Sequence, residues 1–509
     1  MKMEYMKATA TRRQFLKSAA ATGAMLGLGG WDIVSALPPV SAAEAGLEPN
    51  RVRFSPEIEP LVRLLEDTPR ERLLEEVGFR IRHGLSYRDL LAAVLLAGIR
   101  DIEPHPVGFK FHAVLVLNSA HLASLAAPDS ERWLPIFWAL DYFKSSQKEN
   151  EQKGDWHLRA PDEARLPSGA KAGQAFIDAM ENWDEEAADA AVTALARSAS
   201  AQEVFELFCR YGARDFRDIG HKAIYVANSW RTLQCIGWRH AEPVLRSLAY
   251  ALLYHDGSAN PARSALEPDL PGRRNLERLK QIRPDWRAGA VDGQATLALL
   301  DTLREGSAGD ASDKVVELLN RGVAAQSVWD ALFAGASELL MRKPGIGTLH
   351  AVTSTNALHY AWQNTTNDET RRFLLLQNAA FLPLFRGSVQ TGVRVDQFEP
   401  LPPKAAGADA LPEIFAEISQ DRLAAARKAL AWLKTNPAPN EFIGTARRLV
   451  FFKGSNPHDY KFSSAVLEDY QHVSPGLRER YLAASVFNLE GSGGADNDLV
   501  NRTRAALEG

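Results

Sequence analysis

Cysteine is nearly absent from this sequence: Cys209 and Cys235 are the only two among 509 residues. Their spacing fits no zinc or iron–sulfur motif, and two cysteines cannot staple a small disulfide-rich fold. Each lies in an apolar, helix-like stretch, which favours two buried free thiols over a disulfide. The stability of the chain therefore has to come from an ordinary hydrophobic core.

The sequence also lacks an excess of positive charge and long apolar runs. Its net charge is −4 at pH 7. Binding to nucleic acid or to an anionic membrane surface needs a basic patch, so we expect no nucleic-acid partner. A membrane-spanning helix needs about 20 consecutive apolar residues, so we expect no stable membrane span.

The first 42 residues have the layout of an export signal. Arg12 and Arg13 precede Phe-Leu-Lys, a weakly apolar run follows from Ser18 to Gly30, and small residues at 40–43 suit cleavage. This layout predicts a twin-arginine signal peptide over residues 1–42, with the twin-arginine translocase as partner during export. We expect a periplasmic or secreted protein that is exported already folded. The segment carries +3, which leaves −7 on the rest of the chain.

The remaining sequence has helical periodicity. Apolar residues recur at spacings of three and four from Ile58 to Glu76, from Gln202 to Tyr211 and from Ser312 to Gly322, in segments rich in strong helix formers. Alternating, strand-like runs are scarce. We predict an all-α fold with a single large helical domain over residues 43–490, followed by a flexible C-terminal tail over residues 491–509.

A ten-residue motif occurs twice. Residues 112–121 and residues 350–359 both read H-A-V-x-x-x-N-x-x-H, with five identical positions in ten. We interpret the two copies as equivalent helices of an internal helical repeat that surrounds a central histidine-lined cavity.

Four histidines near the starts of helix-like runs form a candidate metal site. His112, His221, His350 and His458 are separated by 109, 129 and 108 residues, roughly a quarter of the chain each. Neutral imidazoles that converge from separate helices suit iron, copper or zinc. We predict that these four residues are the metal ligands.

Helix geometry leaves a choice within each copy of the motif. His121 follows His112 by nine residues, and His359 follows His350 by the same number, which is about half a turn at 100° per residue. One helix cannot direct both histidines at one site. We favour His112 and His350, because small residues share the face of His350, but His121 and His359 remain the alternative.

Polar residues accompany two of these histidines. Tyr225 and Asn228 share the face of His221 on an otherwise apolar stretch, and Lys461 follows His458 by three residues. A polar stripe on an apolar helix lines a wet cavity or joins a buried hydrogen-bond network. We predict that His221, Tyr225, Asn228 and Lys461 are catalytic. No HExxH motif and no Gly-x-Ser-x-Gly elbow accompanies them, so neither a zincin nor an α/β-hydrolase is indicated.

Several blocks resemble the questin oxidase-like family: residues 219–248, residues 347–361, Asn456-Pro457-His458-x-x-Lys461 and Phe111-His112-Ala113. They are scattered between about residues 80 and 480. The resemblance implies an all-helical fold and an oxygenase-like oxidoreductase that acts on an aromatic or polyketide-like small molecule. It also implies NADPH as the electron donor.

Two functions from other classes fit the same residues. The first is a helical-toroid lyase or hydrolase that acts on a polysaccharide, with Tyr225, His221 and Asn228 as base, acid and charge neutraliser. The second is a non-enzymatic helical-repeat binding protein whose histidines are structural. A redox-active metal would argue against the first, and loss of the fold on histidine replacement would favour the second.

Overall fold

The computed structural model describes residues 50–254, 260–386, 392–405, 409–436 and 439–508. The predicted signal peptide lies outside the described residues. In the described ranges the fold is all-α, with 23 α-helices and no strand, as predicted. The chain from Asn50 onward forms one unit, consistent with a single helical domain. None of its described helices is both long and apolar enough to cross a membrane.

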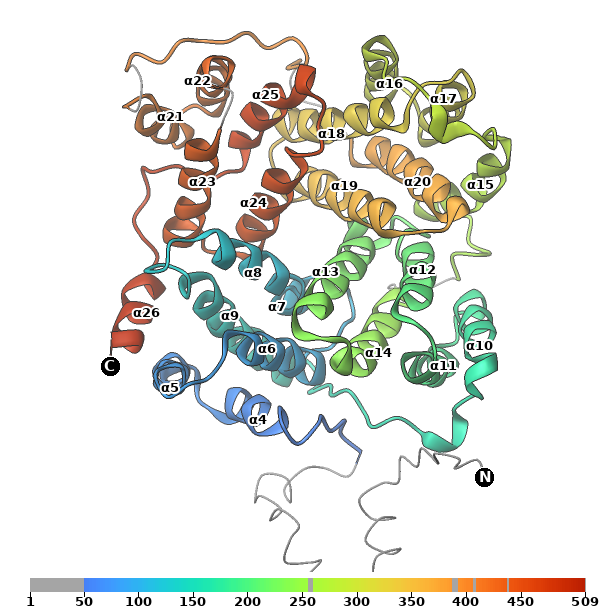
Figure 1. Cartoon of the computed structure of the whole chain (residues 1–509), viewed down its shortest axis with the longest axis vertical. Coiled ribbons are helices and arrows are strands. Elements are labelled where there is room, and N and C mark those ends of the chain that lie inside the picture. Colours follow the sequence, from blue (N-terminus) through green and yellow to red (C-terminus); the bar gives the residue numbers. More distant parts are fainter. Residues whose placement is uncertain (1–49, 255–259, 387–391, 406–408, 437–438, 509) are drawn as a thin grey trace, which may run out of the picture. The chain divides into compact units, whose positions relative to one another are not determined.

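Figure 1 shows the helices, labelled in chain order. The first half of the chain contains α4 (Glu59–Asp67), α5 (Arg70–Arg82), α6 (Tyr87–Asp101), α7 (His112–Leu115), α8 (Leu117–Ala126), α9 (Leu134–Gln152), α10 (Gly169–Asn182), α11 (Glu185–Ser198), α12 (Ala201–Gly212), α13 (His221–Ile236) and α14 (Ala241–Leu252). The second half contains α15 (Leu270–Arg278), α16 (Gly293–Glu305), α17 (Ala308–Asn320), α18 (Ala325–Arg342), α19 (Ile346–Asn364), α20 (Asp368–Arg386), α21 (Ala410–Ile418), α22 (Arg422–Thr435), α23 (Asn440–Lys453), α24 (Pro457–Asp469), α25 (Pro475–Ala484) and α26 (Leu499–Glu508).

Four helices form a ring in the middle of this unit. Helix α13 packs against α19, α19 against α24, α24 against α8, and α8 against α13 (Figure 1). Every residue of α13 from His221 to Leu233 is buried, as is every residue of α19 from Thr348 to His359. A helix that is buried on all sides lies in the interior of a large domain. These helices are therefore the core around which the amphipathic outer helices pack.

The two copies of the repeated motif do not have the same backbone. The copy at 350–359 lies within the continuous helix α19, whereas the copy at 112–121 is divided between α7 and α8 at Val116. Both copies still place their first histidine at the same end of the central ring. The motif thus marks equivalent positions, while the internal repeat itself remains a prediction.

Two predictions about local structure are wrong, one about a single helix and one about the C-terminal tail. The pattern from Ile58 to Glu76 is two helices, because Thr68 precedes a proline and adopts an extended backbone (ψ 126°). The predicted flexible tail contains α26, whose Val500, Thr503 and Ala506 are buried. This helix packs against α5, where Gly78 permits close approach to Ala506. Residues 499–508 are therefore part of the fold.

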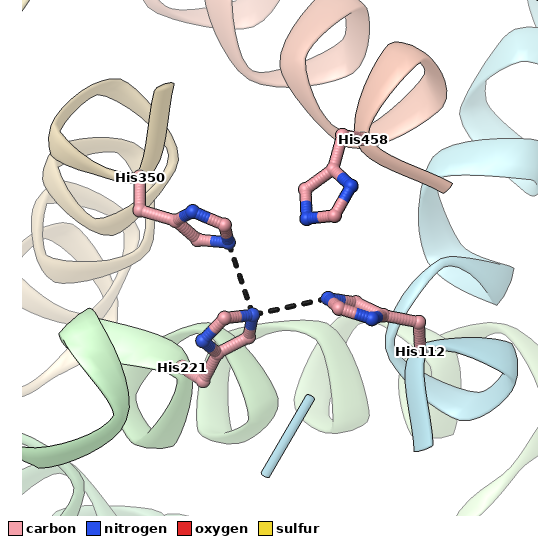
Figure 2. A group of neighbouring side chains, drawn as sticks. All are labelled: His112, His221, His350 and His458. Carbon is pink, nitrogen blue, oxygen red and sulfur yellow. Dashed lines mark hydrogen bonds between the residues drawn. The ribbon is translucent and has the colours of Figure 1, made fainter. Parts of the chain in front are cut away.

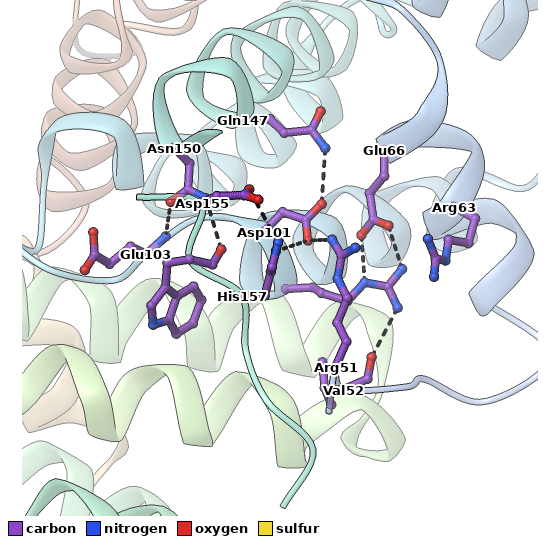
Figure 3. Close-up of polar contacts among 12 residues, drawn as sticks. Arg51, Val52, Arg63, Glu66, Asp101, Glu103, Gln147, Asn150, Asp155 and His157 are labelled. Atoms are coloured by element: carbon purple, nitrogen blue, oxygen red, sulfur yellow. Dashed lines mark hydrogen bonds and ion pairs between the residues drawn. The ribbon is translucent and has the colours of Figure 1, made fainter. Parts of the chain in front are cut away.

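A buried ionic network holds the helices beside α7 and α8 in place (Figure 3). Arg100 of α6 donates two hydrogen bonds of 2.8 Å to the carboxylate of Glu66 in α4. Its neighbour Asp101 pairs with Arg51 and accepts a 3.1 Å hydrogen bond from Gln147 of α9. Each buried charge has a partner, so the network joins α4, α6 and α9 without an uncompensated charge.

Candidate metal centre

The four histidines predicted as ligands lie together at one end of the central ring (Figure 2). One ligand nitrogen from each of His112, His221, His350 and His458 lies within 4.8 Å of the others. Their rings turn toward a common point, with neighbouring centroids 4.2–5.2 Å apart. This cluster of four buried or half-buried imidazoles can hold a metal ion. The four histidine side chains contact one another, so the central cavity expected from the sequence remains a prediction.

Local backbone structure aims each ring. His112 and His221 are the first residues of α7 and α13, and His458 is the second residue of α24, after the capping residue Asn456. His350 is not at a helix start as the sequence suggested, because α19 begins one turn earlier, at Ile346. The first turns of α7, α13 and α24 and the second turn of α19 therefore bring the four histidines to the same end of the ring.

Backbone carbonyls fix the protonation of three of the rings. The Nδ1–H groups of His112, His221 and His350 donate to the carbonyl oxygens of the preceding turn, at 2.9, 2.6 and 2.6 Å. A carbonyl oxygen only accepts, so Nδ1 carries the proton in each ring and Nε2 presents a lone pair. A second hydrogen bond of this kind orients metal-bound histidines in general.

The three lone pairs face one another. Nε2 of His221 lies 3.1 Å from Nε2 of His112 and 3.0 Å from Nε2 of His350. Two nitrogens that both present lone pairs repel unless a proton or a metal ion lies between them. Nitrogens bound to one metal at 2.0–2.1 Å are about 3.0–3.4 Å apart, so the observed spacing suits a shared metal ion.

His458 and Lys461 complete the cluster from α24. The Nε2 atom of His458 and the Nζ atom of Lys461 are buried and have no hydrogen-bond partner among the described residues. Burial lowers the pKa of Lys461 to about 7. The pKa of His458 falls to about 4, through burial and then through the charge of Lys461. Lys461 thus places an ionisable amine beside the imidazoles.

The imidazoles are neutral near pH 7. Burial lowers the pKa of His112, His221 and His350 well below the usual value, and the charge of Lys461 lowers each further. Neutral imidazole is the form that binds metals. The cluster is therefore ready to bind a cation without first losing protons.

Two glycines shape this end of the ring. A Cβ atom at Gly108 would lie 3.5 Å from Nε2 of His221, so the backbone of residue 108 borders the cluster. Gly220 precedes His221 with φ +82°, and a Cβ atom there would lie 2.7 Å from Cβ of Ser354 in α19. The close approach of α13 to α19 therefore depends on glycine at position 220.

Two predicted catalytic residues lie outside the cluster. The Tyr225 hydroxyl donates to Ser247 at 3.0 Å, in a fully buried environment that raises its pKa. The Asn228 amide donates to the carbonyl of Leu115 at 2.9 Å. Both polar groups are therefore used in hydrogen bonds that join α13 to α14 and to α7. Of the predicted catalytic set, the structure brings together only His221 and Lys461.

The alternative histidines face elsewhere. His121 contacts Tyr87 and Cys235, and His359 packs against Trp329 and three other rings. His112 and His350 therefore belong to the centre, as helix geometry favoured. Sequence reasoning missed the carbonyls of Phe109, Asp218 and Ile346, since main-chain groups carry no sequence signal.

Fold and site together define an all-helical protein with a buried four-histidine cluster that can hold a metal ion. Comparison with known proteins adds no relative: no family model, no curated protein and no solved structure matches the chain. The resemblance to the questin oxidase-like family therefore remains an expectation from the sequence.

Proposed function

We propose that the protein is an exported, metal-dependent oxidoreductase whose centre consists of His112, His221, His350 and His458. The convergence of three Nε2 lone pairs, each enforced by a carbonyl on Nδ1, carries this proposal. A set of imidazole donors without thiolate or carboxylate suits iron, copper or zinc. Bound iron or copper would supply one-electron and dioxygen chemistry.

The residues of the chain supply the proton chemistry. Lys461 has a pKa of about 7, close to the pH at which a general acid–base group works best. Burial keeps its amine away from bulk water, so it can hold or release a proton beside the centre. We expect an organic small molecule as the substrate, of the aromatic or polyketide-like kind that the family resemblance implies. NADPH enters only through that resemblance.

A redox cycle tests the oxidoreductase proposal. Protein loaded with iron or with copper should change its absorption spectrum on anaerobic reduction with dithionite and recover it in air. The His350→Ala variant should show neither change, and the matched His359→Ala variant should show both. A centre that accepts zinc alone, with no spectral change on reduction, would contradict the proposal and favour a hydrolase or a lyase.

A further inference from the structure

A second polar constellation lies away from the metal centre. It joins three helices, with Cys235 from α13, His121 from α8 and Tyr87 from α6. The sulfur of Cys235 lies 3.2 Å from Nε2 of His121, and Nδ1 of His121 lies 3.0 Å from the Tyr87 hydroxyl. A nucleophile, a base and a group that orients the base stand in this order in nucleophilic sites.

The tautomer of His121 decides what this pair can do, because the Tyr87 hydroxyl can either donate to Nδ1 or accept from it. When the Tyr87 oxygen accepts the Nδ1–H of His121, Nε2 is left with a lone pair that faces the thiol of Cys235. This tautomer is the one that removes a proton from the thiol.

Burial leaves both members of the pair uncharged. Burial lowers the pKa of His121, so the ring is neutral at pH 7. Burial raises the pKa of Cys235, and Arg88 offsets only part of this effect. A neutral thiol thus stands beside a neutral imidazole, and the thiol needs the base in order to react.

We propose that Cys235 is a nucleophilic thiol that reacts with small peroxides, with His121 as its general base and Tyr87 as the positioning residue. In this step the sulfur attacks one peroxide oxygen, an S–O bond forms and the O–O bond breaks. Cysteine is oxidised to sulfenic acid and hydrogen peroxide is reduced to water. The thiol proton passes to Nε2 of His121 and from there to the leaving oxygen. Half-buried Cys235 favours a small co-reactant of this class over a polymer.

The chain contains internal controls for this site. Cys209, the other free cysteine, is only 2% exposed and lies in α12. His359, which occupies the position of His121 in the second copy of the motif, contacts aromatic rings and His472. His121 therefore has a thiol partner that the equivalent His359 lacks. The site does not depend on the metal centre.

Trapping of sulfenic acid tests the proposal. The full-length protein is treated with hydrogen peroxide and dimedone, and the adducts at both cysteines are followed by mass spectrometry. Cys235 should form its adduct at least about tenfold faster than Cys209, and His121→Ala should slow the reaction about 100-fold, the usual range for loss of a general base. The His359→Ala variant should leave the rate unchanged. Added imidazole should partly rescue His121→Ala.

A second variant keeps the test decisive if His121→Ala unfolds. Tyr87→Phe retains both the ring and the imidazole and removes only the oxygen that accepts Nδ1–H. It should slow the Cys235 adduct about tenfold while circular dichroism stays unchanged. Equal labelling of Cys235 and Cys209, or full reactivity in Tyr87→Phe and His121→Ala, would overturn the proposal. Neither result would affect the metal centre.

Discussion

The guanidinium of Arg231 donates a hydrogen bond to the carboxylate of Glu468 at 2.5 Å, and so joins α13 to α24. Each residue lies ten positions after the histidine that its helix contributes to the cluster, which is about 15 Å along the helix. Asn356 of α19 bonds to both, through its oxygen to Arg231 at 3.2 Å and through its amide to Glu468 at 2.7 Å. The three helices are thus held in register at both ends.

Replacement of Asn356 tests whether this network stabilises the ring. The Asn356→Leu variant leaves the buried carboxyl of Asp469 without its 2.9 Å donor. We expect the free energy of unfolding to fall by about 2–4 kcal/mol, as for other buried polar groups that lose a partner. Denaturant titration of the metal-free protein measures it. The half-buried Asn364→Ala variant on the same helix should cost less than about 1 kcal/mol.

Lys461 is expected to reduce stability. Its buried amine lacks a hydrogen-bond partner in the described part of the chain, so Lys461→Met should raise the melting temperature of the metal-free protein by a few degrees. The variant should bind metal at least as tightly, because a like charge is removed from the site. A lower melting temperature together with lost metal binding would show that the amine has a structural role.

Gly220 should be intolerant of any side chain. Gly220→Ala places a Cβ atom 2.7 Å from Cβ of Ser354 and strains the backbone at φ +82°. We expect a loss of about 1–3 kcal/mol in unfolding free energy and weaker metal binding, since His221 follows directly. Gly173→Ala is the matched control, because a Cβ atom there would meet no neighbour within 4 Å outside its own helical turn. Thermal melting and metal titration of both variants give the comparison.

Stability should fall in acid partly because of His359. Burial lowers the pKa of this residue to about 3, whereas an unfolded histidine titrates near 6.5. Between these values the unfolded chain binds a proton that the folded chain does not. The stabilising contribution is therefore complete above pH 6.5 and is lost as the pH falls. His359→Leu should reduce the difference in unfolding free energy between pH 7 and pH 5.5 by about 1 kcal/mol. An unchanged difference would mean that His359 is protonated in the folded protein.

The fold class and the four-histidine cluster could be predicted from the sequence because each leaves a local pattern. Helical periodicity indicated the all-α fold, and the spacing of His112, His221, His350 and His458 indicated residues that meet. Helix geometry also separated His112 from His121 correctly. These arguments need only the position of a residue along its own helix.

Partners that belong to other helices could not be predicted in the same way. Tyr225 and Asn228 share a face with His221, but Ser247 and the carbonyl of Leu115 satisfy their polar groups. The pairing of Cys235 with His121, 114 residues apart, likewise depends on how α8 packs against α13. The buried tail helix α26 was missed because its glycine-rich approach resembles a mobile terminus.

Metal content measured by elemental analysis tests the central claim most directly. The protein would be purified after expression with iron, copper and zinc each supplied, beside the His221→Ala and His359→Ala variants. The four-histidine centre predicts about one transition metal ion per chain in the wild type and in His359→Ala, and almost none in His221→Ala. No metal in the wild type under any of the three conditions, or full occupancy in His221→Ala, would contradict it.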